Sequence, residues 1–254
     1  RLVCVMVLSA ILCQNAKAGL ISENFDSYTI NSALNGQNGG SGFESAWSGS
    51  GFNVSANGFG SSNAATGAGT MVRSLPFSVT SIFGLNSEIH NELWLSFDFS
   101  RSASGNNFSG INFYEGGTER VLIGHNGWSG GASPSNWMIA KDSQAGIISN
   151  VSFETIKTGV VRFNLAPGAG GSADLWVGDG VGPVDVFAAP TLSIGGLTLS
   201  GIDSIAIRGS NSFTVDDIRM DTSLFGVNAV PEPSSLLLVG LAVFGAVGRR
   251  RRVC

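Results

Sequence analysis

An alternation of apolar and polar side chains, repeating every two residues, is the sequence feature that most constrains the fold. In the segment 92–99 every second residue is leucine or phenylalanine. Similar segments lie at 160–165, 173–177, 202–207 and 213–220. A period of two places alternate side chains on one face of a β-strand. Between residues 19 and 230 only 44–47 and 143–149 could form short helices, so the pattern predicts an all-β domain.

Many short strands separated by turn residues are typical of a sandwich or a barrel. We therefore predict an antiparallel jelly-roll β-sandwich over residues 19–229. A domain of about 210 residues buries enough surface to fold without covalent cross-links. Because Cys4, Cys13 and Cys254 all lie outside it, we expect neither disulfides nor cysteine-bound zinc. The segment 31–69 is weakly patterned and forms either a long loop or extra edge strands.

The charge of the sandwich differs from that of the whole chain, whose formal net charge is −4. Six of the 14 basic residues lie in the two terminal segments, which leaves 8 in the body against 17 acidic residues. The body therefore carries a net charge near −9. Binding to nucleic acid is disfavoured, because phosphate recognition needs basic patches.

The N-terminal segment 1–18 has the parts of a secretory signal peptide. A basic residue precedes an apolar run at 2–12, and Ala16 and Ala18 form a small-x-small cleavage site. This pattern predicts export through the Sec translocon and removal of the segment by signal peptidase. The alternative, a lipoprotein signal, needs small residues before Cys13, where bulky ones stand. Because the chain does not begin with methionine, we expect its start to be truncated.

The C-terminal segment 230–254 has the order of parts expected of a sorting signal. A Pro/Glu motif at 230–235 precedes an apolar helix at 236–248 and four arginines at 249–252. The twelve-residue apolar run within that helix would span about 18 Å, which is short of the ~30 Å hydrocarbon core of a bilayer. The arginines after it favour the cytoplasmic side. We interpret the segment as a transient handle; the alternatives are a permanent tail anchor and a buried core helix.

This order of parts resembles the PEP-CTERM sorting motif of Gram-negative bacteria, which is also called an ice-binding protein C-terminal domain. The resemblance implies that the helix sits in the inner membrane until an exosortase cleaves near the Pro-Glu-Pro. The protein would then reach the cell surface or the extracellular polymer. The residues that carry the resemblance are Pro231, Glu232, Pro233, Arg249, Arg250, Arg251 and Arg252.

The segments that open and close the body resemble those of concanavalin-like and carbohydrate-binding-module jelly rolls. An opening "-FD-" segment and a closing "-DD-" segment hold a structural calcium in several such families. That resemblance implies Asp217 or Asp216 as a ligand, helped by Glu23 or Asp26. Calcium takes ~6–8 oxygen ligands, which suits such residues. The alternative is that the two closing aspartates mark a strand end or a bulge.

Two tryptophans are candidates for stacking on sugar rings, because an exposed indole offers a flat apolar surface and an N–H donor. Trp128 and Trp47 both lie in segments rich in Gly and Ser. Trp94 and Trp176 are placed opposite the more apolar face of their strands. The alternative is that most of the tryptophans cover the core of the sandwich.

The sequence offers little for catalysis. The G-x-S-x-G match at 127–131 lacks the strand-to-helix context of a nucleophile elbow. His90 and His125 fall in segments that look like exposed turns. Glycoside hydrolysis needs two positioned carboxylates, and the E-x-D-x-x-E pattern of jelly-roll glucanases does not occur. We therefore expect a protein that is not an enzyme.

The function predicted from the sequence is that of a secreted, exosortase-sorted β-sandwich with a structural or adhesive role. Its expected location is the inner membrane during processing, and then the cell surface or extracellular matrix. Exopolysaccharide is the expected partner. The alternative is a calcium-dependent carbohydrate-binding module, and a hydrolase is the third hypothesis. No cofactor is expected apart from the structural calcium.

Overall fold

A computed structural model describes residues 20–56, 58–59, 62–76, 92–101, 108–125, 136–142, 146–152, 155–166, 170–180, 182–199 and 201–227. The expected signal peptide, the apolar C-terminal helix and the sorting motif lie outside these ranges. Within them, no helix is long and apolar enough to cross a membrane.

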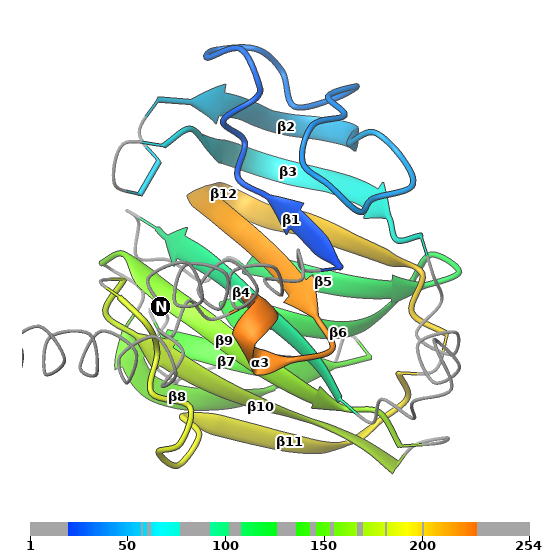
Figure 1. The fold of residues 1–254 in the computed structure, drawn as a ribbon, viewed down its shortest axis with the longest axis vertical. Coiled ribbons are helices and arrows are strands. Elements are labelled where there is room, and N and C mark those ends of the chain that lie inside the picture. Colours follow the sequence, from blue (N-terminus) through cyan, green and yellow to red (C-terminus); the bar gives the residue numbers. More distant parts are fainter. Residues whose placement is uncertain are drawn as a thin grey trace, which may run out of the picture.

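Strands dominate the described part of the chain, and a single helical turn follows them (Figure 1). The elements are β1 (Ile21–Glu23), β2 (Ser48–Ser55), β3 (Ala64–Ser74), β4 (Glu92–Ser100), β5 (Ser109–Glu115), β6 (Thr118–His125), β7 (Asn136–Lys141), β8 (Ile147–Ser152), β9 (Lys157–Asn164), β10 (Gly171–Gly178), β11 (Leu192–Leu197), β12 (Ser204–Asp221) and α3 (Leu224–Val227). The strand pairings in these ranges are antiparallel. The all-β prediction is therefore confirmed.

The long strand β12 joins the two layers of the fold. One of its edges pairs with β3 and then with β1. The other edge pairs with β5 over Ser204–Gly209 and with β4 beyond Thr214. From there β4 leads to β9, β10 and β11, while β5 leads to β6, β7 and β8. In Figure 1, β12 (yellow to orange) crosses between the β2–β3 pair and the strands β4 and β5.

Aromatic side chains from the two layers meet in one core. The ring centroids of Phe97 on β4 and Trp137 on β7 are 5.7 Å apart. Those of Phe113 on β5 and Phe163 on β9 are 5.0 Å apart. All four side chains are at most 1% exposed. The two sheets thus pack face to face, as the predicted jelly-roll β-sandwich requires.

Two segments differ from the structure predicted for them, and in a third the structure decides between a long loop and edge strands. The segments 202–207 and 213–220 belong to one continuous strand, β12, whose ladder with β3 shifts register between them. The segment 31–69 holds β2 and the start of β3, so it supplies edge strands. Residues 147–149, the end of the possible short helix at 143–149, instead lie in β8, which pairs with β7.

A smaller apolar cluster covers the outer face of the β4–β9–β10 sheet. Trp94 and Trp176 stack there with ring centroids 6.0 Å apart. Val160, Val184 and Val227 pack with them, and the cluster lies beneath the loop after β10 and the helix α3. Both tryptophans are therefore buried although they face away from the main core, as the alternation of their strands predicted.

Candidate functional site

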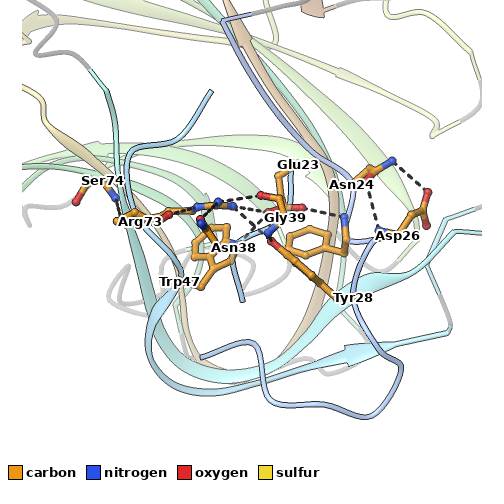
Figure 2. Close-up of polar contacts among 11 residues, drawn as sticks. Glu23, Asn24, Asp26, Tyr28, Asn38, Gly39, Trp47, Arg73 and Ser74 are labelled. Carbon is orange, nitrogen blue, oxygen red and sulfur yellow. Dashed lines mark hydrogen bonds and ion pairs between the residues drawn. The ribbon is translucent and has the colours of Figure 1, made fainter. Parts of the chain in front are cut away.

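A buried carboxylate, Glu23 at the end of β1, organises the first polar cluster (Figure 2). Its Oε2 accepts hydrogen bonds from the Tyr28 hydroxyl at 2.6 Å and from Trp47 Nε1 at 3.1 Å. The same oxygen forms an ion pair with Nη1 of Arg73 at 2.6 Å. Its Oε1 accepts the backbone N–H of Phe25 at 3.1 Å. Glu23 is 0% exposed, so these groups replace the water that its charge would otherwise need.

Arg73 on β3 is equally well satisfied. Its Nε donates to the carbonyl of Ser45 at 2.6 Å. Its Nη2 donates to Oδ1 of Asn38 at 2.9 Å and to the carbonyl of Gly39 at 2.8 Å. The guanidinium also lies over the ring of Phe43, 4.1 Å from the centroid. One arginine thus ties the irregular opening segment to the sandwich.

The contacts of Glu23 remove it from the expected calcium ligands, because its carboxylate already carries an arginine and three hydrogen bonds. Figure 2 shows Asp26 on the far side of this cluster, where it contacts Asn24 and not Arg73. Burial, followed by the hydrogen bond to Glu23, raises the pKa of Tyr28 well above its usual range. Tyr28 therefore stays a neutral donor to the carboxylate.

The prediction that Trp47 is available to a sugar ring is wrong. Trp47 is 1% exposed, and its indole N–H is used by Glu23. Its ring packs beside Phe25 and Phe43. The surrounding Gly and Ser residues suggested a surface loop, but the opening segment folds back and covers the ring. Trp47 is a structural residue of the buried cluster.

Two of the other three expected metal ligands, Asp26 and Asp216, are linked through the adjacent residues Asn63 and Ser62. Asp216 accepts a hydrogen bond from the Ser62 hydroxyl at 2.6 Å. Asp26 accepts one from the backbone N–H of Asn63 at 2.8 Å. Asp216 is 2% exposed, and burial raises its pKa to about 7. Within the described ranges, no group of three or more His, Cys, Asp or Glu side chains is arranged to hold a metal ion.

Asp217 faces a different set of groups from Asp216. It lies where the β12–β4 ladder shifts register, and its φ is +52°. Both of its carboxylate oxygens accept hydrogen bonds from Nη2 of Arg219 at 2.8 Å. The alternative interpretation of the two aspartates as the mark of a bulge therefore matches the backbone geometry.

A second polar cluster lies on the outward face of β12, β5 and β6, and we call it the Arg208 face. Nη1 of Arg208 and Nδ2 of Asn112 both donate to Oε2 of Glu119, each at 2.6 Å. The guanidinium lies 4.7 Å from the ring centroid of Phe108. Burial raises the pKa of Tyr114, whose hydroxyl accepts from Arg208 at 3.4 Å. This arrangement presents a cation, an aromatic ring and a neutral phenol together.

Asn112 is the unusual member of the Arg208 face. It is 0% exposed, and its Oδ1 has no hydrogen-bond partner among the described residues. A buried acceptor without a donor costs about 1–3 kcal/mol, so such groups invite a functional explanation. Beside this cluster lies a cleft of about 400 Å³, lined in part by Glu44, Ser74 and Ser204. Ser204 pairs directly with Tyr114 across the β12–β5 ladder, so the cleft adjoins the Arg208 face.

Sequence reasoning did not single out Arg73 or Arg208. A signal was present for Arg73, because it is the single charged residue in a strand of otherwise small or apolar residues. His125 was wrongly expected in an exposed turn. It ends β6, is 1% exposed, and its Nδ1 lies 2.8 Å from Nη1 of Arg101.

Several residues singled out in the sequence lie outside the described ranges. They are His90, Trp128, the 127–131 motif, the cleavage site at Ala16 and Ala18, and the C-terminal sorting residues.

The C-terminal segment of the chain matches a known sorting signal. The sequence model of the PEP-CTERM protein-sorting motif matches residues 229–252. This chain carries a PEP-CTERM motif. The match confirms the resemblance found in the Pro-Glu-Pro, the apolar run and the arginines. A PEP-CTERM motif implies export, processing by an exosortase, and a membrane-anchored or surface location.

Solved structures with a similar course of the chain include two polysaccharide lyases. An endo-β-1,4-glucuronan lyase from Trichoderma reesei is 11% identical, over 80% of this chain and 98% of that one, with a TM-score of 0.45. The alginate lyase Aly36B is 10% identical, over 79% and 96%, with a TM-score of 0.46. The binding domain of botulinum neurotoxin serotype C1 is 13% identical, over 79% and 50%, with a TM-score of 0.45. No curated protein matches the chain in sequence.

The Glu23–Arg73 pair yields a stability prediction. Glu23→Gln leaves Arg73 buried without a counter-charge, so we expect the free energy of unfolding to fall by about 3–5 kcal/mol. Urea denaturation measures this change. The matched control is Glu92→Gln, because Glu92 is 43% exposed and lies 3.6 Å from Arg162. That change should cost at most about 1 kcal/mol, and equal losses in both variants would contradict the structural role of Glu23.

The raised pKa of Asp216 predicts how stability depends on pH. The folded state binds this proton more tightly than the unfolded state, for which the ordinary value of 3.8 applies. The contribution of this bound proton to the stability of the folded state is therefore complete below about pH 4, and it is lost as the pH rises through about 7. The shift of about three units corresponds to about 4 kcal/mol at most.

The measurement is urea denaturation of wild type and Asp216→Asn between about pH 4 and about pH 8. Because Asp98 also has a raised pKa and Asp179 a lowered one, the difference between the two proteins isolates Asp216. We expect the wild type to lose stability relative to the variant as the pH rises. Parallel curves for the two proteins would contradict the prediction.

Proposed function

We propose that this chain is an exported protein of the cell surface or extracellular matrix, with a structural or adhesive role and no enzymatic activity. The observation that carries the proposal is the PEP-CTERM match at residues 229–252. Such a handle delivers a folded body to the outside of the cell. The body contains no cysteine, so its folding does not depend on the redox conditions of that destination.

The Arg208 face is the part of the sandwich that we assign to adhesion. Its guanidinium is 35% exposed on a body that is otherwise acidic. Arginine offers a planar set of donors to carboxylates and hydroxyls, and Phe108 and Tyr114 offer apolar and polar ring edges beside it. These groups suit an exopolysaccharide, which presents hydroxyl donors together with acceptor oxygens.

The sorting half of the proposal is tested with the full-length chain, tagged behind the signal peptide, in an exosortase-containing Gram-negative bacterium. We expect the tag at the cell surface or in the matrix. In an exosortase-deficient strain, and for the variant carrying Glu232→Ala and Pro233→Ala, it should stay in the membrane fraction. The adhesive half is tested by retention on the exopolysaccharide of that host. Arg208→Ala should weaken retention about tenfold, because charged hydrogen bonds contribute about 1.5–3 kcal/mol.

The control for adhesion is Arg120→Ala. Arg120 is 29% exposed and pairs with Glu115 and Asp142 away from the Arg208 face. Its loss should leave retention unchanged. Equal loss in the two variants would show general electrostatic binding and contradict the assignment. Unchanged sorting without the exosortase would contradict the first half independently.

The second candidate function is that of a calcium-dependent carbohydrate-binding module. The observation that favours it is that Asp26 and Asp216 bind the adjacent residues Asn63 and Ser62. A cation between these two carboxylates would compensate for the energetic cost of burying the negative charge of Asp216. We propose Asp26 and Asp216 as the ligands. Glu23 and Asp217 are not included, because each forms an ion pair with an arginine.

Calcium should then raise the melting temperature at about pH 8, where Asp216 is ionised. The physical reason is that a ligand bound only by the folded state stabilises it. Asp216→Asn should abolish the effect, whereas Asp185→Asn, in the loop after β10, should keep it. A wild-type melting curve that is unchanged by millimolar calcium would remove this candidate.

A further inference from the structure

A cleft of about 320 Å³ lies on the outward face of the other sheet, away from the Arg208 face. Its lining includes Asp98 of β4, Thr158 of β9, Asp217 and Arg219 of the β12 bulge, Gly182 and Val227. Asp98 and Thr158 are direct partners in the β4–β9 ladder. The bulge turns Asp217 toward the same cleft, so three strands contribute polar groups to one hollow.

The charges in this cleft are not balanced. Arg219 uses one nitrogen to bind both carboxylate oxygens of Asp217, which neutralises that residue. Asp98 receives one hydrogen bond, from the Thr158 hydroxyl to Oδ1 at 2.5 Å. Its Oδ2 accepts none from the described residues. A partly buried carboxylate with one oxygen unused by the described residues therefore faces the hollow without a cation of its own, because Arg219, which lies nearby, is bound to Asp217.

Hydrogen-bond chemistry limits what could supply that cation. A calcium ion takes ~6–8 oxygens, and in the described ranges no group of three or more His, Cys, Asp or Glu side chains is arranged to hold a metal ion. An ammonium group offers three donors and needs fewer acceptors. Apolar lining from Pro183 and Val227 can cover the carbon skeleton that carries it.

We propose that this cleft binds a small primary ammonium compound, with its nitrogen on Asp98. The volume lies at the lower end of the ~300–1,000 Å³ range of small-molecule sites, so one amine-bearing unit fits and a polymer strand does not. An amino sugar and an alkylamine such as a lysine side chain share this chemistry. The site is separate from the proposed adhesive face and does not depend on it.

The test is calorimetric titration of the full chain at neutral pH with glucosamine, with cadaverine and with N-acetylglucosamine. N-acetylglucosamine has the ring of the amino sugar without its charge. We expect at least one of the two amines to bind about tenfold or more tightly than the uncharged sugar. Binding of glucosamine alone identifies an amino sugar as the source, and binding of cadaverine identifies an alkylamine.

The decisive variant is Asp98→Asn, which keeps an acceptor for Thr158 and removes the charge. It should weaken amine binding about tenfold or more. The matched control is Glu92→Gln, because Glu92 lies on the same face of β4, outside the cleft, and should bind as the wild type does. Melting curves establish that both variants fold, and Asp217→Asn serves as a second variant should Asp98→Asn not fold.

Three results would overturn the proposal: saturable binding of neither amine, equal affinity for N-acetylglucosamine, or amine binding that Asp98→Asn leaves intact. Full competition by millimolar calcium would overturn it as well, because it would indicate a general cation site.

Discussion

The ion pair between Glu23 and Arg73 is the interaction on which the arrangement of the opening segment depends. Residues 24–47 contain no named strand, so side-chain contacts and scattered backbone hydrogen bonds, such as that from Leu34 N–H to the carbonyl of Phe52, hold them in place. Arg73 reaches Asn38, Gly39 and Ser45 from the same guanidinium that pairs with Glu23. Because the side chains of Arg73 and Glu23 are only 2% and 0% exposed, the pair is costly to form but more costly to break. It therefore fixes one conformation of a segment that its own sequence leaves open.

This anchoring has a consequence for the fold as a whole. Glu23 ends β1, which lies against the end of β12, and Arg73 lies on β3, which runs along most of the same edge of β12. The ion pair thus ties together the two strands that share one edge of the central strand. The opposite edge of β12 divides its pairing between β4 and β5, and this division creates the two sheets.

The sequence carried the fold class and the sorting signal because both depend on local order. The alternation at 92–99 needs only neighbouring residues, and so does the order of motif, apolar run and arginines. Contacts between residues far apart in the sequence produce no local pattern of this kind, and Glu23 and Arg73 are fifty residues apart. Trp47 shows the same limit, since its Gly- and Ser-rich neighbours suggest exposure while the fold buries it. Asp216 and Asp217 are adjacent in sequence, yet the bulge places Asp216 against Ser62 and Asp217 against Arg219.

The end of the sandwich explains how a processed handle is compatible with a stable body. The carbonyl of Val227 accepts a hydrogen bond from the Ser96 hydroxyl at 2.7 Å, and Val227 packs with Trp94 and Trp176. The PEP-CTERM match begins two residues later. If an exosortase cuts near the Pro-Glu-Pro, as the proposed function requires, every strand and α3 lie upstream of the cut. The helix α3 then holds the new end against β4, and removal of the handle breaks none of the described packing.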